Sequence, residues 1–224
     1  MAEARALASD TLAPWAELVP GRGYTTVDDM LALPDDDGWR YEVVEGVLVR
    51  MAGSGEEATT IAFGLGTVLH GFVRPRRLGI VTGADGVYKF RGAETGLTPD
   101  VGFYLAERRA YISDRTKPVP FAPDLAVEVA SPSQYGPEMT AKAKLYLEGG
   151  TQLVWIIWPA KQRIDVWRPS STERPALTLG IDDALNGEDV VPGFTYPVAD
   201  VFAVPPHATV EEGGSDRNGS HAAC

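Results

Sequence analysis

The stretch Pro123-Asp124-Leu125-Ala126-Val127-Glu128-Val129 predicts a buried β-strand that carries carboxylates. The run from Leu125 to Ala130 is too apolar to form a solvated face, yet Glu128 lies in the middle of it. Burying a lone carboxylate is costly unless it meets a partner or a metal ion. We therefore expect Glu128 to belong to a functional site and not only to the fold.

In addition to this strand, the sequence contains two further charged residues of interest. The pair Pro99-Asp100 lies in a strand-like run from Leu97 to Tyr104, and Lys142 lies on a short amphipathic helix predicted from Pro137 to Leu147. Carboxylates beside a lysine suit metal-assisted phosphodiester cleavage. Hard oxygen ligands hold Mg²⁺ or Mn²⁺, the metal lowers the pKa of a bound water, and the ammonium neutralises charge that builds on the phosphate.

Each of these residues also has a purely structural interpretation. An aspartate that follows a proline commonly caps a strand or a turn. Lys142 and Lys144 on an exposed helix would ordinarily be solvated, and Glu42 could be an exposed acid on an edge strand. Glu128 is the hardest to explain by structure alone, because buried charges are usually paired or functional.

Hydrophobic periodicity along the chain predicts a mixture of strands and helices. A second, longer helix is expected from Glu56 to Val73. Strands are expected in a hairpin at Arg40–Met51 with its turn at Glu45-Gly46, and at Gly79–Thr82, Gly86–Phe90, Leu153–Trp158, Arg163–Trp167, Ala176–Leu179 and Asp189–Phe194. We predict an α/β fold, an α+β sandwich in stricter terms, with a central mixed sheet that carries the carboxylates and one helix on each face.

Length and composition limit the class of protein. The chain has 224 residues, of which 44% are hydrophobic, so we predict one domain at 25–203 between a flexible segment at 1–24 and a disordered tail at 204–224. No apolar run approaches the ~18 residues of a membrane span, and we expect a soluble, cytoplasmic protein. The single cysteine, Cys224, and three scattered histidines argue against a disulfide framework or a zinc cluster. The net charge of −11 argues against broad affinity for nucleic acid.

The order of motifs resembles the Uma family (Uma-two) of restriction endonucleases, within the PD-(D/E)xK nuclease superfamily. The likeness covers roughly residues 25 to 203, and its most specific part is Glu128-Val129-Ala130-Ser131-Pro132-Ser133. Its other landmarks are Tyr41-Glu42-Val43-Val44-Glu45-Gly46, Thr98-Pro99-Asp100-Val101, Lys142, Tyr146, Gly149-Gly150, Val154-Trp155-Ile156-Ile157-Trp158-Pro159 and Val191-Pro192-Gly193-Phe194.

The resemblance implies a restriction-endonuclease-like sheet and a set of site residues. Asp100 and Glu128 match the metal-binding acids, and Glu42 matches an acid that completes the metal shell. The superfamily's usual lysine position is Ala130 here, so the role passes to Lys142 on the following helix. The implied cofactor is Mg²⁺ or Mn²⁺, the implied partner is DNA, and double-strand cleavage by a single-site domain favours a homodimer.

The chain also departs from the family pattern. Many members carry a histidine early in the main helix, where this chain has Glu56-Glu57-Ala58-Thr59-Thr60. This departure keeps a second hypothesis open: a catalytically inactive copy of the fold that binds a protein or a nucleic acid.

Overall fold

The structure is a computed structural model that describes residues 17–18, 24–34, 39–51, 53–131 and 136–203. The tail predicted at 204–224 lies outside the described residues, as does most of the segment predicted to be flexible at 1–24. Within that segment, Glu17–Leu18 forms a short strand, β1, whose backbone pairs with Arg50 and Val49.

A six-stranded sheet forms the centre of the fold, in the order β11-β10-β9-β8-β7-β4. Its strands β8 and β9 are parallel and all its other neighbours are antiparallel, so the predicted mixed sheet is confirmed. Helix α3 (Gly136–Glu148) carries the chain from β8 to β9, because parallel neighbours need a crossover connection. The strands are β4 (Gly79–Gly83), β7 (Val101–Leu105), β8 (Leu125–Val129), β9 (Leu153–Trp158), β10 (Arg163–Trp167) and β11 (Leu177–Leu179).

A second sheet, which the sequence did not predict, has the order β1-β3-β2-β6-β5. Strands β2 (Arg40–Val44) and β3 (Val47–Met51) form the expected hairpin, and both turn residues, Glu45 and Gly46, have positive φ (50° and 79°), as a two-residue hairpin turn requires. The sheet is completed by β5 (Tyr88–Phe90) and β6 (Thr95–Leu97), and helix α1 (Val27–Leu31) packs against it behind a Thr26–Asp29 capping box.

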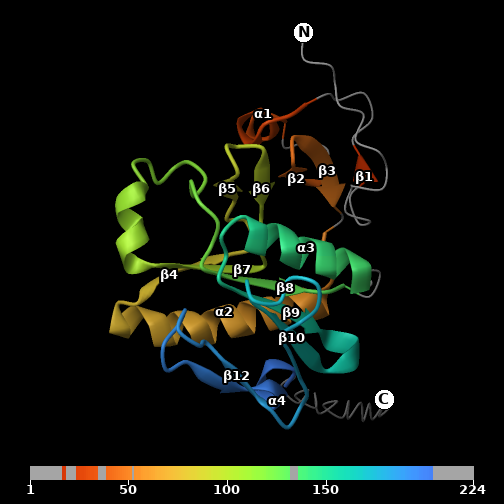
Figure 1. The fold of residues 1–224 in the computed structure, drawn as a ribbon, viewed down its shortest axis with the longest axis vertical. Coiled ribbons are helices and arrows are strands. Elements are labelled where there is room, and N and C mark those ends of the chain that lie inside the picture. Colours follow the sequence, from red (N-terminus) through yellow and green to blue (C-terminus); the bar gives the residue numbers. More distant parts are fainter. Residues whose placement is uncertain (1–16, 19–23, 35–38, 52, 132–135, 204–224) are drawn as a thin grey trace, which may run out of the picture.

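Two helices cover opposite faces of the central sheet (Figure 1). Helix α2 (Glu56–Arg76) buries apolar residues at helical spacing, from Ala58 to Val73, against one set of alternating strand residues. Helix α3 packs on the other face together with Val44, Tyr88 and further residues of the second sheet. The alternation of the strands therefore decides which residues point towards α3, and this face carries the site described below.

The remaining elements are short. They are η1 (Ala106–Tyr111), η2 (Pro159–Lys161), β12 (Ala184–Asn186), β13 (Thr195–Pro197) and α4 (Val198–Val201). None of the helices in the described part of the chain is both long and apolar enough to cross a bilayer.

Two strand predictions were wrong. The run from Leu97 to Tyr104 is not one strand: β6 ends at Leu97 in the second sheet, and β7 begins at Val101 in the central sheet. Pro99 lies in the break, and it has no amide hydrogen to pair in a ladder. The segment Asp189–Phe194 forms turns between β12 and β13 and not an edge strand. The break between β6 and β7 matters most for the site, because Asp100 lies in it.

Candidate active site

Asp100 and Glu128 lie side by side across strands β7 and β8. Val101 pairs with Val127, so the next position along the antiparallel ladder sets Asp100 opposite Glu128 on the same face. Oδ2 of Asp100 accepts a hydrogen bond of 2.8 Å from the amide of Val129, which ties the break before β7 to the end of β8. Both acids therefore lie at one end of the central sheet, on the face covered by α3.

Helix α3 brings Lys142 onto this pair. Its Nζ lies 2.9 Å from Oε1 and 3.0 Å from Oε2 of Glu128, and the residue is only 4% exposed. Lys142 shares the buried face of α3 with Met139, Ala143 and Tyr146, so it is not a solvated lysine. Lys142 therefore contacts both oxygens of the Glu128 carboxylate.

Two other lysines, Lys144 and Lys89, pair with acids elsewhere. Lys144 pairs with Glu173 at 2.6 Å and is partly exposed, whereas Lys89 pairs with Asp28 at 2.7 Å. The helical rotation between positions 142 and 144 is enough to move a side chain from the core face to the outer face. Of these three lysines, the contacts thus single out Lys142.

Tyr146 is a member of the site that sequence reasoning treated only as a family landmark. Its buried hydroxyl donates a 2.7 Å hydrogen bond to Oε1 of Glu128. The signal for it was present, because Tyr146 follows Lys142 by four residues and so lies on the same face of α3. Tyr146 and Lys142 together hold the Glu128 carboxylate from the helix side.

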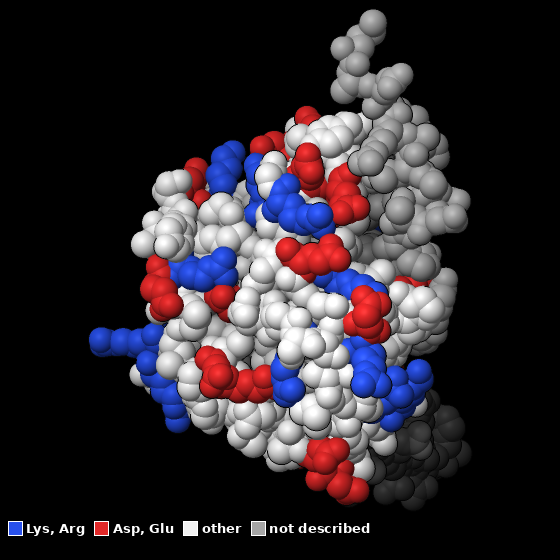
Figure 2. Space-filling model, in the orientation of Figure 1, with Lys and Arg blue, Asp and Glu red and all other residues white. Residues whose placement is uncertain are grey.

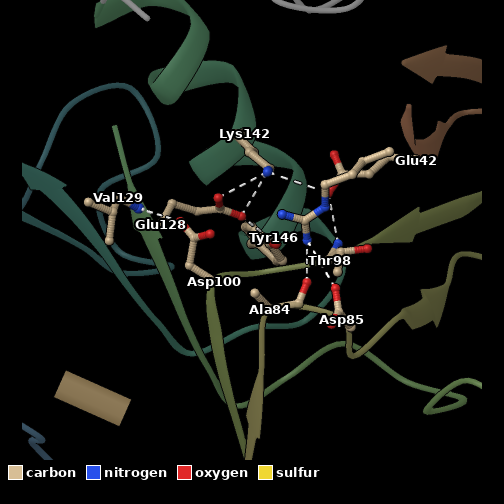
Figure 3. A network of polar contacts seen from close by, with 10 residues as sticks. Glu42, Ala84, Asp85, Thr98, Asp100, Glu128, Val129, Lys142 and Tyr146 are labelled. Atoms are coloured by element: carbon tan, nitrogen blue, oxygen red, sulfur yellow. Dashed lines mark hydrogen bonds and ion pairs between the residues drawn. The ribbon is translucent and has the colours of Figure 1, made fainter. Parts of the chain in front are cut away.

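Glu42 is contributed by the second sheet, from β2. It is fully buried, and its Oε1 accepts a 2.8 Å hydrogen bond from the amide of Thr98 while lying 3.4 Å from Nζ of Lys142. Figure 3 shows Lys142 between Glu128 and Glu42. Oε2 of Glu42 has no hydrogen-bond partner among the described residues. The alternative interpretation of Glu42 as an exposed edge acid is therefore excluded.

Burial and neighbouring charges shift the pKa values of Glu128, Lys142 and Tyr146. Burial is the largest cause that raises the pKa of Glu128 to about 8; Lys142 opposes it, and the carboxylates of Asp100 and Glu42 raise it further. Burial would lower the pKa of Lys142, but the charges of Glu128, Glu42 and Asp100 together outweigh burial and raise that pKa. The pKa of the Tyr146 hydroxyl is also raised, by burial and then by Glu128. Glu128 thus retains a proton near neutral pH, while Lys142 stays charged.

The proton on Glu128 predicts that the protein loses stability as the pH rises. Between pH 4.5, the ordinary value for a glutamate, and about pH 8, the folded state holds a proton on Glu128 that the unfolded state has released. The free energy of unfolding should therefore fall across this window, with a slope approaching about 1.4 kcal/mol per pH unit. Urea unfolding at several pH values measures this slope. Glu128→Gln should flatten the profile, and a flat wild-type profile would show that Glu128 is ionised throughout.

The second acid of the opening stretch, Asp124, has a structural role at the opposite end of β8. It accepts hydrogen bonds from the amide of Leu105 at 2.8 Å and from Nη1 of Arg108 at 2.7 Å. The Arg108 guanidinium also lies over the ring of Phe121. Asp124 therefore anchors the chain around η1 and does not join the cluster.

The cluster offers a limited set of metal ligands. No group of three or more His, Cys, Asp or Glu side chains within the described ranges is placed to hold a metal ion on its own. Mg²⁺ does not require such a cage, because it usually binds through one or two carboxylates and keeps waters or substrate oxygens as its other ligands. The adjacent acids Asp100 and Glu128, with the unpartnered oxygen of Glu42 in the same cluster, fit a hard divalent ion by donor chemistry.

Comparison with known proteins found one matching family and a similar solved structure. The model of the Uma2 family, described as "Putative restriction endonuclease", matches residues 27–199. A solved structure from Anabaena variabilis, described as "a putative nuclease belonging to DUF820", is similar with a TM-score of 0.63 and 22% identity over 79% of this chain and 97% of that chain. At this identity the likeness shows a shared fold. No match was found among curated proteins.

The matched region confirms the family expected from the sequence. It includes every residue of the cluster, from Glu42 through Asp100 and Glu128 to Lys142 and Tyr146. Since the family model spans more than half of the chain, this protein belongs to the Uma2 family of restriction-endonuclease-like proteins.

Proposed function

We propose that this protein is a metal-dependent endonuclease that hydrolyses phosphodiester bonds in DNA. The observation that carries the proposal is the cluster itself, in which the buried carboxylates of Glu42 and Glu128 lie beside Lys142 of α3, and the half-buried Asp100 lies at the end of β8. A buried ion pair contributes little to stability compared with apolar residues of the same size. Such a costly arrangement at one end of a sheet is typical of a functional site.

Asp100 and Glu128 would hold the ion, which we propose to be Mg²⁺ or Mn²⁺, and Glu42 lies in the same cluster to complete the shell. When bound, the ion would supply a Lewis acid for the phosphate and lower the pKa of a water. Lys142 would neutralise charge that develops on the phosphate, because its raised pKa keeps it protonated at neutral pH. Tyr146 would keep the Glu128 carboxylate oriented through its hydrogen bond.

Glu42 has a second role in this proposal, as a positioning residue. Its hydrogen bond to the Thr98 amide fixes the chain two residues before Asp100. The amide of Val129 fixes the Asp100 carboxylate from the other side. The chain around Asp100 is thereby held from both sheets, so little reorganisation would be needed when Asp100 takes up a ligand.

DNA is the proposed substrate because of the family and the chemistry of the cluster. The charge does not point to broad electrostatic binding: the net charge is −11, and Figure 2 shows acidic and basic side chains interspersed on the visible face. Binding would then depend on local contacts near the site. Cleavage of both strands would require two sites, so we include a homodimer on DNA in the proposal.

One observation favours a second candidate, an inactive member of the fold that only binds. Both oxygens of Glu128 are already engaged, by Lys142 and Tyr146, as in a closed structural cluster. An active site must exchange part of these contacts for a metal ion, whereas an inactive copy keeps them. The two candidates therefore differ in their response to divalent ions.

Mn²⁺ is expected to stabilise the folded protein if the site is active. At a concentration a hundred times its Kd, an ion that binds only the folded state adds about 2.7 kcal/mol to the free energy of unfolding. Thermal melting and calorimetry with Mn²⁺ or Mg²⁺ measure this effect, and a panel of single- and double-stranded DNA, with RNA for comparison, tests cleavage. Absence of both binding and cleavage would favour the inactive copy.

A further inference from the structure

A pocket of about 360 Å³ adjoins the site on the side of α2. One stripe of the helix lines it, at the spacing of a single helical face: Thr59, Ala62, Phe63, Gly66, Thr67 and His70. Its opposite wall includes Val81 and Val101 of the central sheet, and Asp100 lines it as well. The pocket and the acidic cluster therefore share Asp100. Its volume lies at the small end of the range for ligand pockets, about 300–1,000 Å³.

Small residues of α2 leave this space open. Ala62 and Gly66 lie on the stripe where larger side chains would occupy the pocket, and a Cβ at Gly66 would come within 3.3 Å of Val101. Phe63 stands next to them and is 78% exposed, although phenylalanine is among the residues most often buried. An exposed aromatic beside a small apolar pocket is suited to hold a flat ligand.

The lining favours a neutral occupant over a phosphate. Of its two basic side chains, Arg40 and His70, Arg40 already donates to the carbonyl of Ala84 and pairs with Asp85. Asp100 would repel an anion. The pocket therefore fits a neutral, flat group with polar edges. The hydroxyl oxygens of Thr59 and Thr67 could accept hydrogen bonds from it, since their own hydrogens are donated to backbone carbonyls.

We propose that this pocket receives one unstacked nucleobase of the strand whose phosphate lies at the acidic cluster. The proposal rests on the proposed function, since it takes the scissile phosphate to be next to Asp100. A nucleotide places its charged phosphate and its neutral flat base on neighbouring parts of one molecule, and the cluster and the pocket match these two parts. Phe63 provides the stacking surface, which binds any base because each has a π face.

The substrate class follows from this geometry. A base can enter the pocket only after it leaves the helical stack, which costs energy in a paired duplex and little in a single strand. The protein should therefore prefer single-stranded DNA, or duplex with an unpaired nucleotide, over fully paired duplex. This preference agrees with a protein of net charge −11, which gains little from long-range attraction to a duplex.

The test is a thermodynamic cycle on binding, measured by fluorescence anisotropy in EDTA so that no cleavage is needed. One probe is a short labelled dT strand, and the other is a strand of the same length and charge built from abasic nucleotides. The wild type should bind the dT strand about 5- to 150-fold more tightly than the abasic strand. Phe63→Ala should reduce this ratio to near one.

Tyr111→Ala is the matched control, because Tyr111 is an aromatic of similar exposure (71%) that does not line the pocket. It should leave the ratio unchanged, and melting curves should show that both variants fold. Equal ratios in the wild type and Phe63→Ala, or a wild-type ratio of one, would overturn the proposal. Cleavage in Mn²⁺ is scored separately: base-dependent binding without cleavage would reject the nuclease and retain the pocket, and the reverse would reject only the pocket.

Discussion

Asp100→Asn is expected to lower DNA cleavage in Mg²⁺ or Mn²⁺ by at least about 10²–10³-fold, the loss seen when a single oxyanion-hole donor is removed. An amide is a weaker ligand than a carboxylate for a hard divalent ion, so the bound ion and the activated water would be lost together. The fold should survive, because the amide oxygen of Asn can still accept the hydrogen bond from Val129. Cleavage rates, with melting temperatures of both proteins, measure the effect.

Asp124→Asn is the matched control for this substitution. Asp124 also accepts a backbone amide hydrogen bond on the central sheet, but it lies at the other end of β8 and pairs with Arg108. It should reduce stability and leave the cleavage rate of the folded protein close to that of the wild type. Equal cleavage by wild type, Asp100→Asn and Glu128→Gln would point to a contaminating nuclease and remove the support for the site.

Lys142→Met is expected to destabilise the protein by about 3–5 kcal/mol at neutral pH, the cost of removing one partner from a buried ion pair. The substitution leaves Glu128 and Glu42 buried without the ammonium that lies 2.9 Å and 3.4 Å from them. A typical domain has only about 5–15 kcal/mol of stability, so much of it would be lost. Urea unfolding at neutral pH gives the value.

Lys144→Met provides the comparison on the same helix. Lys144 pairs with Glu173 at 2.6 Å, but the two side chains are 31% and 82% exposed, and such surface pairs contribute at most about 1 kcal/mol. A double variant, Lys142→Met with Glu128→Gln, should recover part of the lost stability, because an amide at position 128 needs no ammonium beside it. Similar losses from Lys142→Met and Lys144→Met would contradict the buried cluster.

Local sequence patterns predicted the elements that carry the site. The valine-rich run around Glu128 is β8, the segment after Pro137 is α3, and the run from Arg40 to Met51 is a hairpin turned at Glu45-Gly46. These predictions depend on periodicity and turn chemistry, which short segments contain in full. The break at Pro99 was missed, because the apolar residues on both sides of it continue the strand pattern even though they belong to different sheets.

By itself the sequence determined that an acid occupies a buried strand and that a helix with Lys142 follows it. Only the tertiary structure decided which charged groups meet. Glu42 reaches Lys142 because the second sheet packs over α3, and Asp100 faces Glu128 because of the register between β7 and β8. Sheet register and packing of separate elements are set by contacts between residues far apart in the chain, and no local pattern contains them. The same reason explains why Lys142 is buried while Lys144, two residues later, remains partly exposed.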